Sequence, residues 1–159
     1  MNKKWKAVFG KPVPSTTTAE AAREAHTYVN TEEFIEDKYP VDVRYGLSIN
    51  CKVTQDGFRP TWLRKMFLDG VPLRTRKNLD FSIEACDVSE AYVVKWKVLN
   101  RGIEAERRDN IRGQIDVPNR GRGRHEVTSF QGDHYVECYI VKDGVVVARD
   151  RILVPIRPE

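Results

Sequence analysis

The segment HYVECYIVKDGVVVARDRILVPI, residues 134–156, decides the fold of this 159-residue chain. It contains two runs rich in β-branched and aromatic residues, separated by the pair Asp143-Gly144. Asp-Gly between two such runs is a strong signal for a two-residue hairpin turn, because both residues adopt positive φ readily. We therefore predict an antiparallel β-hairpin over residues 134–156.

More strand-like segments lie upstream of this hairpin. In DVRYGLSINCKVT, residues 42–54, apolar and polar residues alternate, which predicts a long half-buried strand from Val43 to Val53. Shorter segments predict strands over 79–85, 91–99 and 127–130, and a short helix over 62–67 that ends at Gly70. Many strands with little helix favour a mainly β fold, and we predict an antiparallel β-sandwich of immunoglobulin-like character over residues 39–159.

Residues 1–38 have a different composition and are predicted to form a connector and a helical arm. A stretch rich in proline and threonine is followed by Thr17 and Glu20, which have the spacing of a capping box, and then by an alanine-rich helix. A second short helix is expected to start at Asn30. Pro40 disfavours helix at the residue before it, so the arm ends there.

The three cysteines do not suggest a metal site or a disulfide framework. Cys51, Cys86 and Cys138 are an odd number with no short spacing between any two of them. Cys51 and Cys138 lie within strand-like runs, so we expect buried thiols. The sequence contains neither a secretory signal nor an apolar run of about 18 residues, which a membrane helix needs. The expected location is the cytoplasm.

The sequence contains none of the common catalytic motifs. Phosphate-binding and dinucleotide-binding glycine loops, the serine elbow of hydrolases and the paired aspartates of nucleotide polymerases are missing. The histidines, His26, His125 and His134, do not have the spacing of a zinc site. We therefore expect no catalytic residues, no metal and no cofactor.

Positive charge is concentrated between residues 100 and 125. This stretch has seven arginines, no lysine and four acidic residues, a net charge of +3 (7 − 4). The planar guanidinium group suits phosphate well, although an ordinary solvated loop is the simpler interpretation. Residues 110–124, which end in NRGRGR, are expected to form a mobile loop.

These observations predict a binding site at one end of the sandwich. Arginines would hold an anion, and Trp96, Tyr92 or Tyr139 would offer a ring face to a base. Because Trp96 alternates with apolar residues, a place in the core is favoured for it over the binding role. Arg112-Gly113 indicates either a close backbone approach or a simple bulge. His134 and Glu137 point to opposite faces of one strand, and each is either functional or an ordinary polar residue. The candidate ligand-binding residues are Trp96, Asn100, Arg101, Arg108, Arg112, Arg124, His134 and Glu137.

Residues 93–115 and 125–156 resemble the adenylyl/guanylyl cyclase and SMODS C-terminal sensor domain family, AGS-C. The resemblance spans about residues 39–156. The matching positions are Trp96, Asn100 with Gly102, Ala105, Arg112-Gly113-Gln114, and the run from His134 to Ile140.

The resemblance implies a non-catalytic domain that follows a nucleotidyltransferase, in the same or an associated chain. In this family the enzyme makes nucleotide second messengers in anti-phage defence of the CBASS type. Residues 5–12 resemble the connector after such a catalytic domain, so we expect the catalytic aspartates to lie outside this sequence. The family provides no established binding residues.

Several functions agree with this sequence. The leading hypothesis is a sensor that binds a nucleotide or another anionic or phage-derived ligand and regulates the nucleotidyltransferase. The alternative is a protein-interaction module that docks on the nucleotidyltransferase or on a phage protein without binding a small molecule. Binding of nucleic acid through the arginine loop ranks third, and an independent enzyme ranks last.

Overall fold

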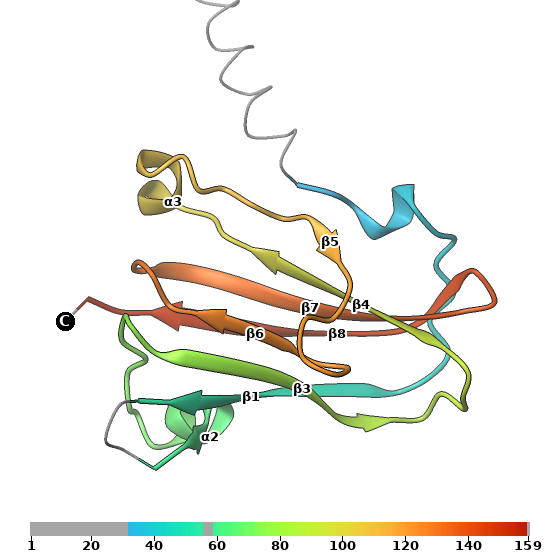
Figure 1. Ribbon diagram of the computed structural model, residues 1–159, viewed down its shortest axis with the longest axis horizontal. Coiled ribbons are helices and arrows are strands. Elements are labelled where there is room, and N and C mark those ends of the chain that lie inside the picture. Colours follow the sequence, from blue (N-terminus) through green and yellow to red (C-terminus); the bar gives the residue numbers. More distant parts are fainter. Residues whose placement is uncertain (1–31, 56–58, 159) are drawn as a thin grey trace, which may run out of the picture. The chain divides into compact units, whose positions relative to one another are not determined.

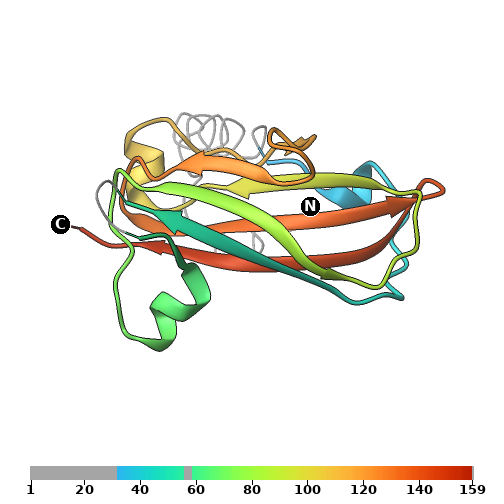
Figure 2. The same ribbon diagram turned by 60° about the horizontal axis from the view of Figure 1, so that its bottom comes forward.

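The computed structural model describes residues 32–55 and 59–158. Its strands form two four-stranded antiparallel sheets, with orders β2-β1-β3-β6 and β5-β4-β7-β8 (Figures 1 and 2). The elements are η2 (Ile35–Asp37), β1 (Leu47–Thr54), β2 (Thr61–Trp62), α2 (Leu63–Leu68), β3 (Asn78–Cys86), β4 (Val93–Leu99), α3 (Ile103–Arg107), β5 (Ile115–Asp116), β6 (Arg124–Val127), β7 (Gly132–Lys142) and β8 (Val145–Ile156). The predicted mainly β fold is confirmed.

The strand order is that of an immunoglobulin-like sandwich. β1, β3 and β6 take the places of strands A, B and E, and β5, β4, β7 and β8 those of C′, C, F and G. β2 is an added strand at the β1 edge. Trp96 lies on β4, where immunoglobulin domains also carry a buried tryptophan, and its ring packs near that of Phe81 with the centroids 6.4 Å apart.

The core lies between the two sheets. Alternate residues of the long strands point inward and are buried, and they include Ile49, Cys51, Val53, Leu79, Phe81, Trp96, Val136, Cys138, Ile140 and Ile152. The predicted hairpin is confirmed, since β7 and β8 pair along their length. Its turn residues, Asp143 and Gly144, have φ of 51° and 77°, as a two-residue hairpin turn with both residues at positive φ requires.

The strand expected from Val43 starts only at Leu47. Residues 40–45 instead run beside β8, where the N–H of Asp42 donates to the carbonyl of Val146 at 2.9 Å. Val43 is therefore 47% exposed. The alternation of apolar and polar residues is the same on both sides of Gly46, so the pattern does not reveal that the chain changes sheet there.

Two other expectations need correction in the second half of the chain. The short strand expected over 127–130 is β6, which covers 124–127 instead. The stretch 110–124, expected to be a mobile loop, contains β5, which pairs with β4. Both strands are short and polar on their outer side, so their hydrophobic pattern is weak.

The predicted helix over 17–30 lies outside the described residues. Of the second expected helix, the structure contains the single 3-10 turn η2, in which Ile35 is 2% exposed. The sandwich belongs to a compact unit that starts at Thr31. Residues 32–38 pack on the outer face of the β5-β4-β7-β8 sheet, and we call them the N-terminal strap.

The expected buried thiols are confirmed for Cys51 and Cys138, both 0% exposed. Burial raises the pKa of each thiol well above its usual value. No helix in residues 32–55 and 59–158 is long and apolar enough to cross a membrane.

Candidate ligand-binding site

A cavity of about 110 Å³ lies between the two sheets at one end of the sandwich. Its walls come from the start of β3 and β7, the end of β4, β6 and β8, and the loops next to them. Apolar core residues form one part, and the polar part consists of Asn100, Asn110, Arg112, Glu126, Thr128, Ser129 and His134. A cavity of this volume has room for several water-sized groups.

His134 is the polar residue most deeply placed in this inter-sheet cavity. It is 4% exposed, and neither ring nitrogen makes a hydrogen bond of normal geometry within the described part of the chain, although the Phe130 backbone lies near enough to act on the ring. Burial lowers the pKa of His134, although the Phe130 backbone and Asp133 oppose this shift. The ring is therefore neutral near pH 7. A buried polar group without a partner costs about 1–3 kcal/mol, so it calls for an explanation.

Phe130 covers His134 on the side of α3. The two rings meet edge to face with centroids 5.1 Å apart, and Phe130 is 6% exposed. The guanidinium group of Arg108, which follows α3, lies over the Phe130 ring at 5.7 Å. Arg108 thus stands outside the cavity and contacts it through Phe130.

Arg112 brings a fixed positive charge to the cavity wall. Its guanidinium NH2 group bonds the Glu126 carboxylate, whose other oxygen accepts from Arg124 Nε at 2.8 Å. Arg124 also reaches Asp116 at 3.2 Å. The Nε of Arg112 is buried and has no partner within the described residues. One carboxylate is therefore shared by two arginines, and Arg112 keeps a free donor.

Asn100 is held beside Arg112 by the backbone. Its N–H donates to the Arg112 carbonyl at 3.0 Å, and its side-chain amide lies 3.4 Å from the Asn110 carbonyl. Asn100, Arg112 and His134, three of the candidates from the sequence, thus line one cavity.

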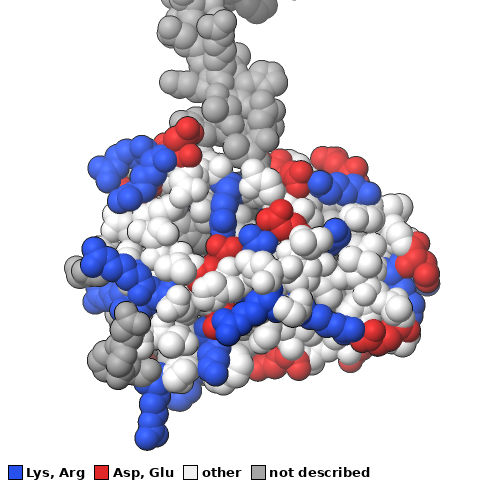
Figure 3. All heavy atoms as spheres, in the orientation of Figure 1, with Lys and Arg blue, Asp and Glu red and all other residues white. Residues whose placement is uncertain are grey.

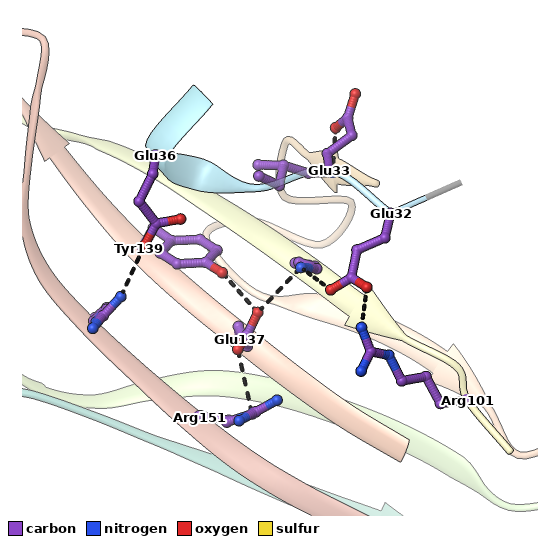
Figure 4. Close-up of polar contacts among 10 residues, drawn as sticks. Glu32, Glu33, Glu36, Arg101, Glu137, Tyr139 and Arg151 are labelled. Atoms are coloured by element: carbon purple, nitrogen blue, oxygen red, sulfur yellow. Dashed lines mark hydrogen bonds and ion pairs between the residues drawn. The ribbon is translucent and has the colours of Figure 1, made fainter. Parts of the chain in front are cut away.

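Two other candidates, Arg101 and Glu137, lie on the outer face of the β5-β4-β7-β8 sheet under the N-terminal strap (Figure 4). They belong to a network around Lys97, whose side chain is 4% exposed and lies 2.9 Å from Glu32 and 3.7 Å from Glu137. Arg101 also bonds Glu32, and the Tyr139 hydroxyl donates to Glu137 at 2.7 Å.

This network fastens the strap to the sheet. Burial alone would raise the pKa of Glu32, but hydrogen bonds from Lys97 and Arg101 outweigh it and lower that pKa. Arg101 and Glu137 are therefore engaged in internal ion pairs.

Of the two roles considered for Trp96, ligand binding and a place in the core, the structure shows the place in the core. It is 0% exposed, and its indole N–H donates to the carbonyl of Arg122 at 2.9 Å. Its ring faces are covered by the core, so they are closed to a ligand in this structure.

Comparison with protein families adds a decisive observation to this geometry. The model of the Adenylyl/Guanylyl and SMODS C-terminal sensor domain family matches residues 29–157. The chain belongs to this family. The AGS-C match includes the N-terminal strap as well as the whole sandwich, and it begins ten residues before the expected start at 39. AGS-C is a family of sensor domains associated with nucleotidyltransferases. No curated protein and no solved structure matches the chain significantly.

The charge pattern of this AGS-C domain differs from what the arginine count suggests. Each of the seven arginines between 101 and 124 makes an ion pair with a carboxylate. Figure 3 shows Lys and Arg side chains interspersed with Asp and Glu on the face it displays. Several partners, namely Glu32, Asp80, Glu90 and Glu126, lie outside the arginine stretch, so counting charges within it overstates its positive character.

Sequence reasoning missed Glu126 and Phe130 as parts of the AGS-C cavity. Glu126 follows Arg124 by two residues on β6, which places both side chains on one face of the strand. The strand expected over 127–130 includes Phe130, although it is a lone apolar residue in the polar run 128–134. A single apolar residue in a polar run is the sequence signal that points to a buried role for Phe130 outside a strand.

Proposed function

We propose that this AGS-C domain is a non-catalytic sensor that binds a nucleotide or another anionic or phage-derived ligand. An anionic group of the ligand enters the inter-sheet cavity, and its binding regulates an attached nucleotidyltransferase in anti-phage defence. The proposal is carried by one observation: His134 and Arg112 line the same cavity, and each has a buried side-chain nitrogen without a hydrogen-bond partner among the described residues.

The chemistry of the cavity suits a phosphate or a carboxylate. Arg112 offers a permanent charge and a free Nε–H, and the neutral His134 ring offers one N–H donor. The apolar walls strengthen both hydrogen bonds, since little water competes in a low-dielectric site. At about 110 Å³ the cavity admits one such group, so the remainder of a nucleotide-sized ligand would lie at its mouth.

The backbone next to Arg112 provides a route for regulation. Gly113 pairs with Glu32 in a parallel bridge, and the N–H of Ile115 donates to the Glu33 carboxylate at 2.7 Å. A Cβ at position 113 would lie 3.2 Å from the Cα of Glu32, so only glycine fits without displacement. A ligand that moves Arg112 would therefore also move the strap, through which the sandwich continues to residues 1–31.

The protein-interaction module remains the second candidate. It is favoured by an apolar surface around the end of α2, where Phe67 is 38%, Leu68 88% and Val71 46% exposed. Exposed apolar residues that cluster in this way often mark a protein interface. In this case the sandwich would dock on the nucleotidyltransferase or on a phage protein through α2.

A thermal-shift screen of the 159-residue chain tests the first proposal. The probes are inorganic phosphate, mononucleotides and cyclic dinucleotides, each at two salt concentrations. We expect one class of probe to raise the melting temperature at both salt concentrations. Arg112→Met should abolish this shift, whereas Arg107→Met, which changes an exposed arginine on α3, should retain it.

The same variants separate the two candidates. Equal shifts in Arg112→Met and in the parent chain would exclude the cavity as the binding site. If no probe shifts the melting temperature, and Leu68→Glu abolishes association with the nucleotidyltransferase catalytic domain in a pull-down, the interaction module is the better account.

A further inference from the structure

A second depression lies on the outer face of the β2-β1-β3-β6 sheet, away from the inter-sheet cavity. It has a volume of about 640 Å³ and is lined by Lys52, Trp62, Asp80, Tyr92, Arg120 and Arg122, among other residues. We call it the outer groove. Figure 2 shows the face of the molecule on which β1 and β3 lie in front. The floor and the rim of the outer groove come from different parts of the chain.

The floor is a cross-strand row of side chains. Lys52 on β1 is opposite Trp62 on one side and Asp80 on the other, and Asp80 is opposite His125 on β6. Trp62 is 43% exposed, which is unusual for so large an apolar ring. The row therefore places an open aromatic surface directly beside a lysine.

The rim is the turn that contains NRGRGR. Gly123 lies so close to β3 that a Cβ there would be 2.3 Å from the Phe81 carbonyl oxygen, which explains why this position is glycine. The Arg122 carbonyl accepts the hydrogen bond from the buried Trp96 indole. The Asn119 side chain bonds the His125 backbone on both sides, at 2.7 and 3.1 Å. The turn is thus fastened at three points and presents its arginines at a defined place.

The arginine side chains are held but accessible. Arg120 pairs with Asp80, and its side chain is 66% exposed. Arg122 pairs with Glu90 and stacks on the Tyr92 ring at 5.1 Å, and it is 57% exposed. The Arg122–Glu90 pair is exposed on both sides, and exposed pairs contribute little, so a phosphate can replace Glu90 at small cost. Asp80 is 28% exposed and also contacts His125 Nδ1 at 2.7 Å. Lys52 makes no ion pair within residues 32–55 and 59–158.

We propose that the outer groove is a nucleotide site distinct from the inter-sheet cavity. A nucleobase stacks on Trp62, and the phosphates contact Lys52, Arg120 and Arg122. An aromatic platform beside cations is the arrangement by which proteins bind nucleotides and single-stranded nucleic acid without reading the base sequence. A free nucleotide and a single-stranded nucleic acid both offer a base and phosphates to this groove. The experiment therefore includes one probe of each kind.

Isothermal titration calorimetry on the full chain tests the site with three probes: ATP, inorganic tripolyphosphate and an eight-residue oligouridylate. We expect ATP to bind more tightly than tripolyphosphate, because only ATP stacks. Trp62→Leu should weaken ATP binding at least about fivefold, the loss of one stacked base, and leave tripolyphosphate unchanged. The double variant K52Q/R122Q should weaken all three probes.

Matched controls lie outside the groove. Phe67→Leu removes another exposed aromatic ring, and R44Q/K65Q removes two other exposed cations; both should retain the parental affinities. Tighter binding of oligouridylate than of ATP identifies a single strand as the source, and the reverse identifies the free nucleotide.

Two results would overturn the site. One is parental ATP affinity in both Trp62→Leu and K52Q/R122Q. The other is loss of all ATP binding in His134→Leu, which would assign the nucleotide to the inter-sheet cavity. The proposal for the outer groove and the proposal for the inter-sheet cavity can therefore be contradicted independently of each other.

Discussion

The backbone N–H of Glu33 donates a hydrogen bond to the carbonyl oxygen of Gly113, 3.0 Å away. This bond joins the N-terminal strap to the residue that follows Arg112 in the cavity wall. The strap is additionally fastened by the buried Lys97, which lies 2.9 Å from Glu32. The N-terminal strap is thus bonded to the residue next to Arg112, in the wall of the cavity where a ligand would bind.

Substitution of Gly113 should loosen the strap without disrupting the sandwich. In Gly113→Ala the new Cβ would come 3.0 Å from Leu99 Cδ1 and 3.2 Å from Glu32 Cα, so the strap must move. We expect a loss of about 1–2 kcal/mol in the free energy of unfolding and at least about tenfold faster exchange of the Glu33 and Ile115 amide hydrogens, measured by NMR.

The matched control for this variant is Gly46→Ala. Its Cβ would meet only the end of the exposed Asp87 side chain, which can rotate away. Equal amide exchange in Gly113→Ala and Gly46→Ala would show that position 113 does not hold the strap.

Removal of the unpartnered imidazole should separate stability from ligand binding. His134→Leu places an apolar side chain against the Phe130 ring and removes two buried nitrogens without partners. We expect the free energy of unfolding to stay the same or rise by about 1 kcal/mol, as measured by urea denaturation, while ligand-induced stabilisation disappears. A loss of 2 kcal/mol or more would assign His134 a structural role instead.

The stability of the domain should decrease as the pH falls below about 6.5, the usual pKa of an unfolded histidine. Burial lowers the pKa of His134 in the folded state, the Phe130 backbone and Asp133 oppose this shift, and the nearby Arg112 adds to it. The unfolded chain therefore binds the proton first, and up to about 1.4 kcal/mol is lost per pH unit between 6.5 and the folded pKa.

The difference between the parental and His134→Leu stability curves isolates this contribution. Other groups, such as Glu32 and Asp80, have lowered pKa values and add losses only below about 4.5. If the two curves run parallel between pH 7 and 5, the folded His134 titrates normally and the inferred burial effect is absent.

The buried Lys97 should be the main electrostatic fastening of the strap. Lys97→Met leaves Glu32 and Glu137 without their shared cation in a mostly buried place, which should cost about 2–4 kcal/mol. Lys38→Met breaks the exposed pair with Glu33 and should cost less than about 1 kcal/mol. Similar losses by urea denaturation for the two variants would contradict this view.

Much of the fold follows from local pattern. The Asp143-Gly144 turn, the alternation through β7 and β8 and the buried Trp96 all have strong short-range signals, and each is found in the structure. The start of β1 was misplaced, because residues 41–45 alternate equally well but pair with β8. Pairing partners are a long-range property that alternation does not specify.

The candidate site was predicted in part. Asn100, Arg112 and His134 line one cavity, because the end of β4, the loop before β5 and the start of β7 meet there. Arg101 and Glu137 are near these residues in sequence but point to the opposite face of the sheet, toward Glu32 and Lys97. The sequence pattern places the strap in the helical arm, so it does not reveal that Glu32 of the strap pairs with Lys97 and Arg101.

The central claim is that an anionic group binds between the sheets, beside His134 and Arg112. The most direct measurement is the ¹⁵N chemical shift of the His134 ring and of Arg112 Nε, recorded while inorganic phosphate, mononucleotides and cyclic dinucleotides are added in turn. We predict that at least one probe shifts both signals at saturable concentration, and that Arg112→Met abolishes the shift at His134. The claim is contradicted if every probe leaves both signals unchanged.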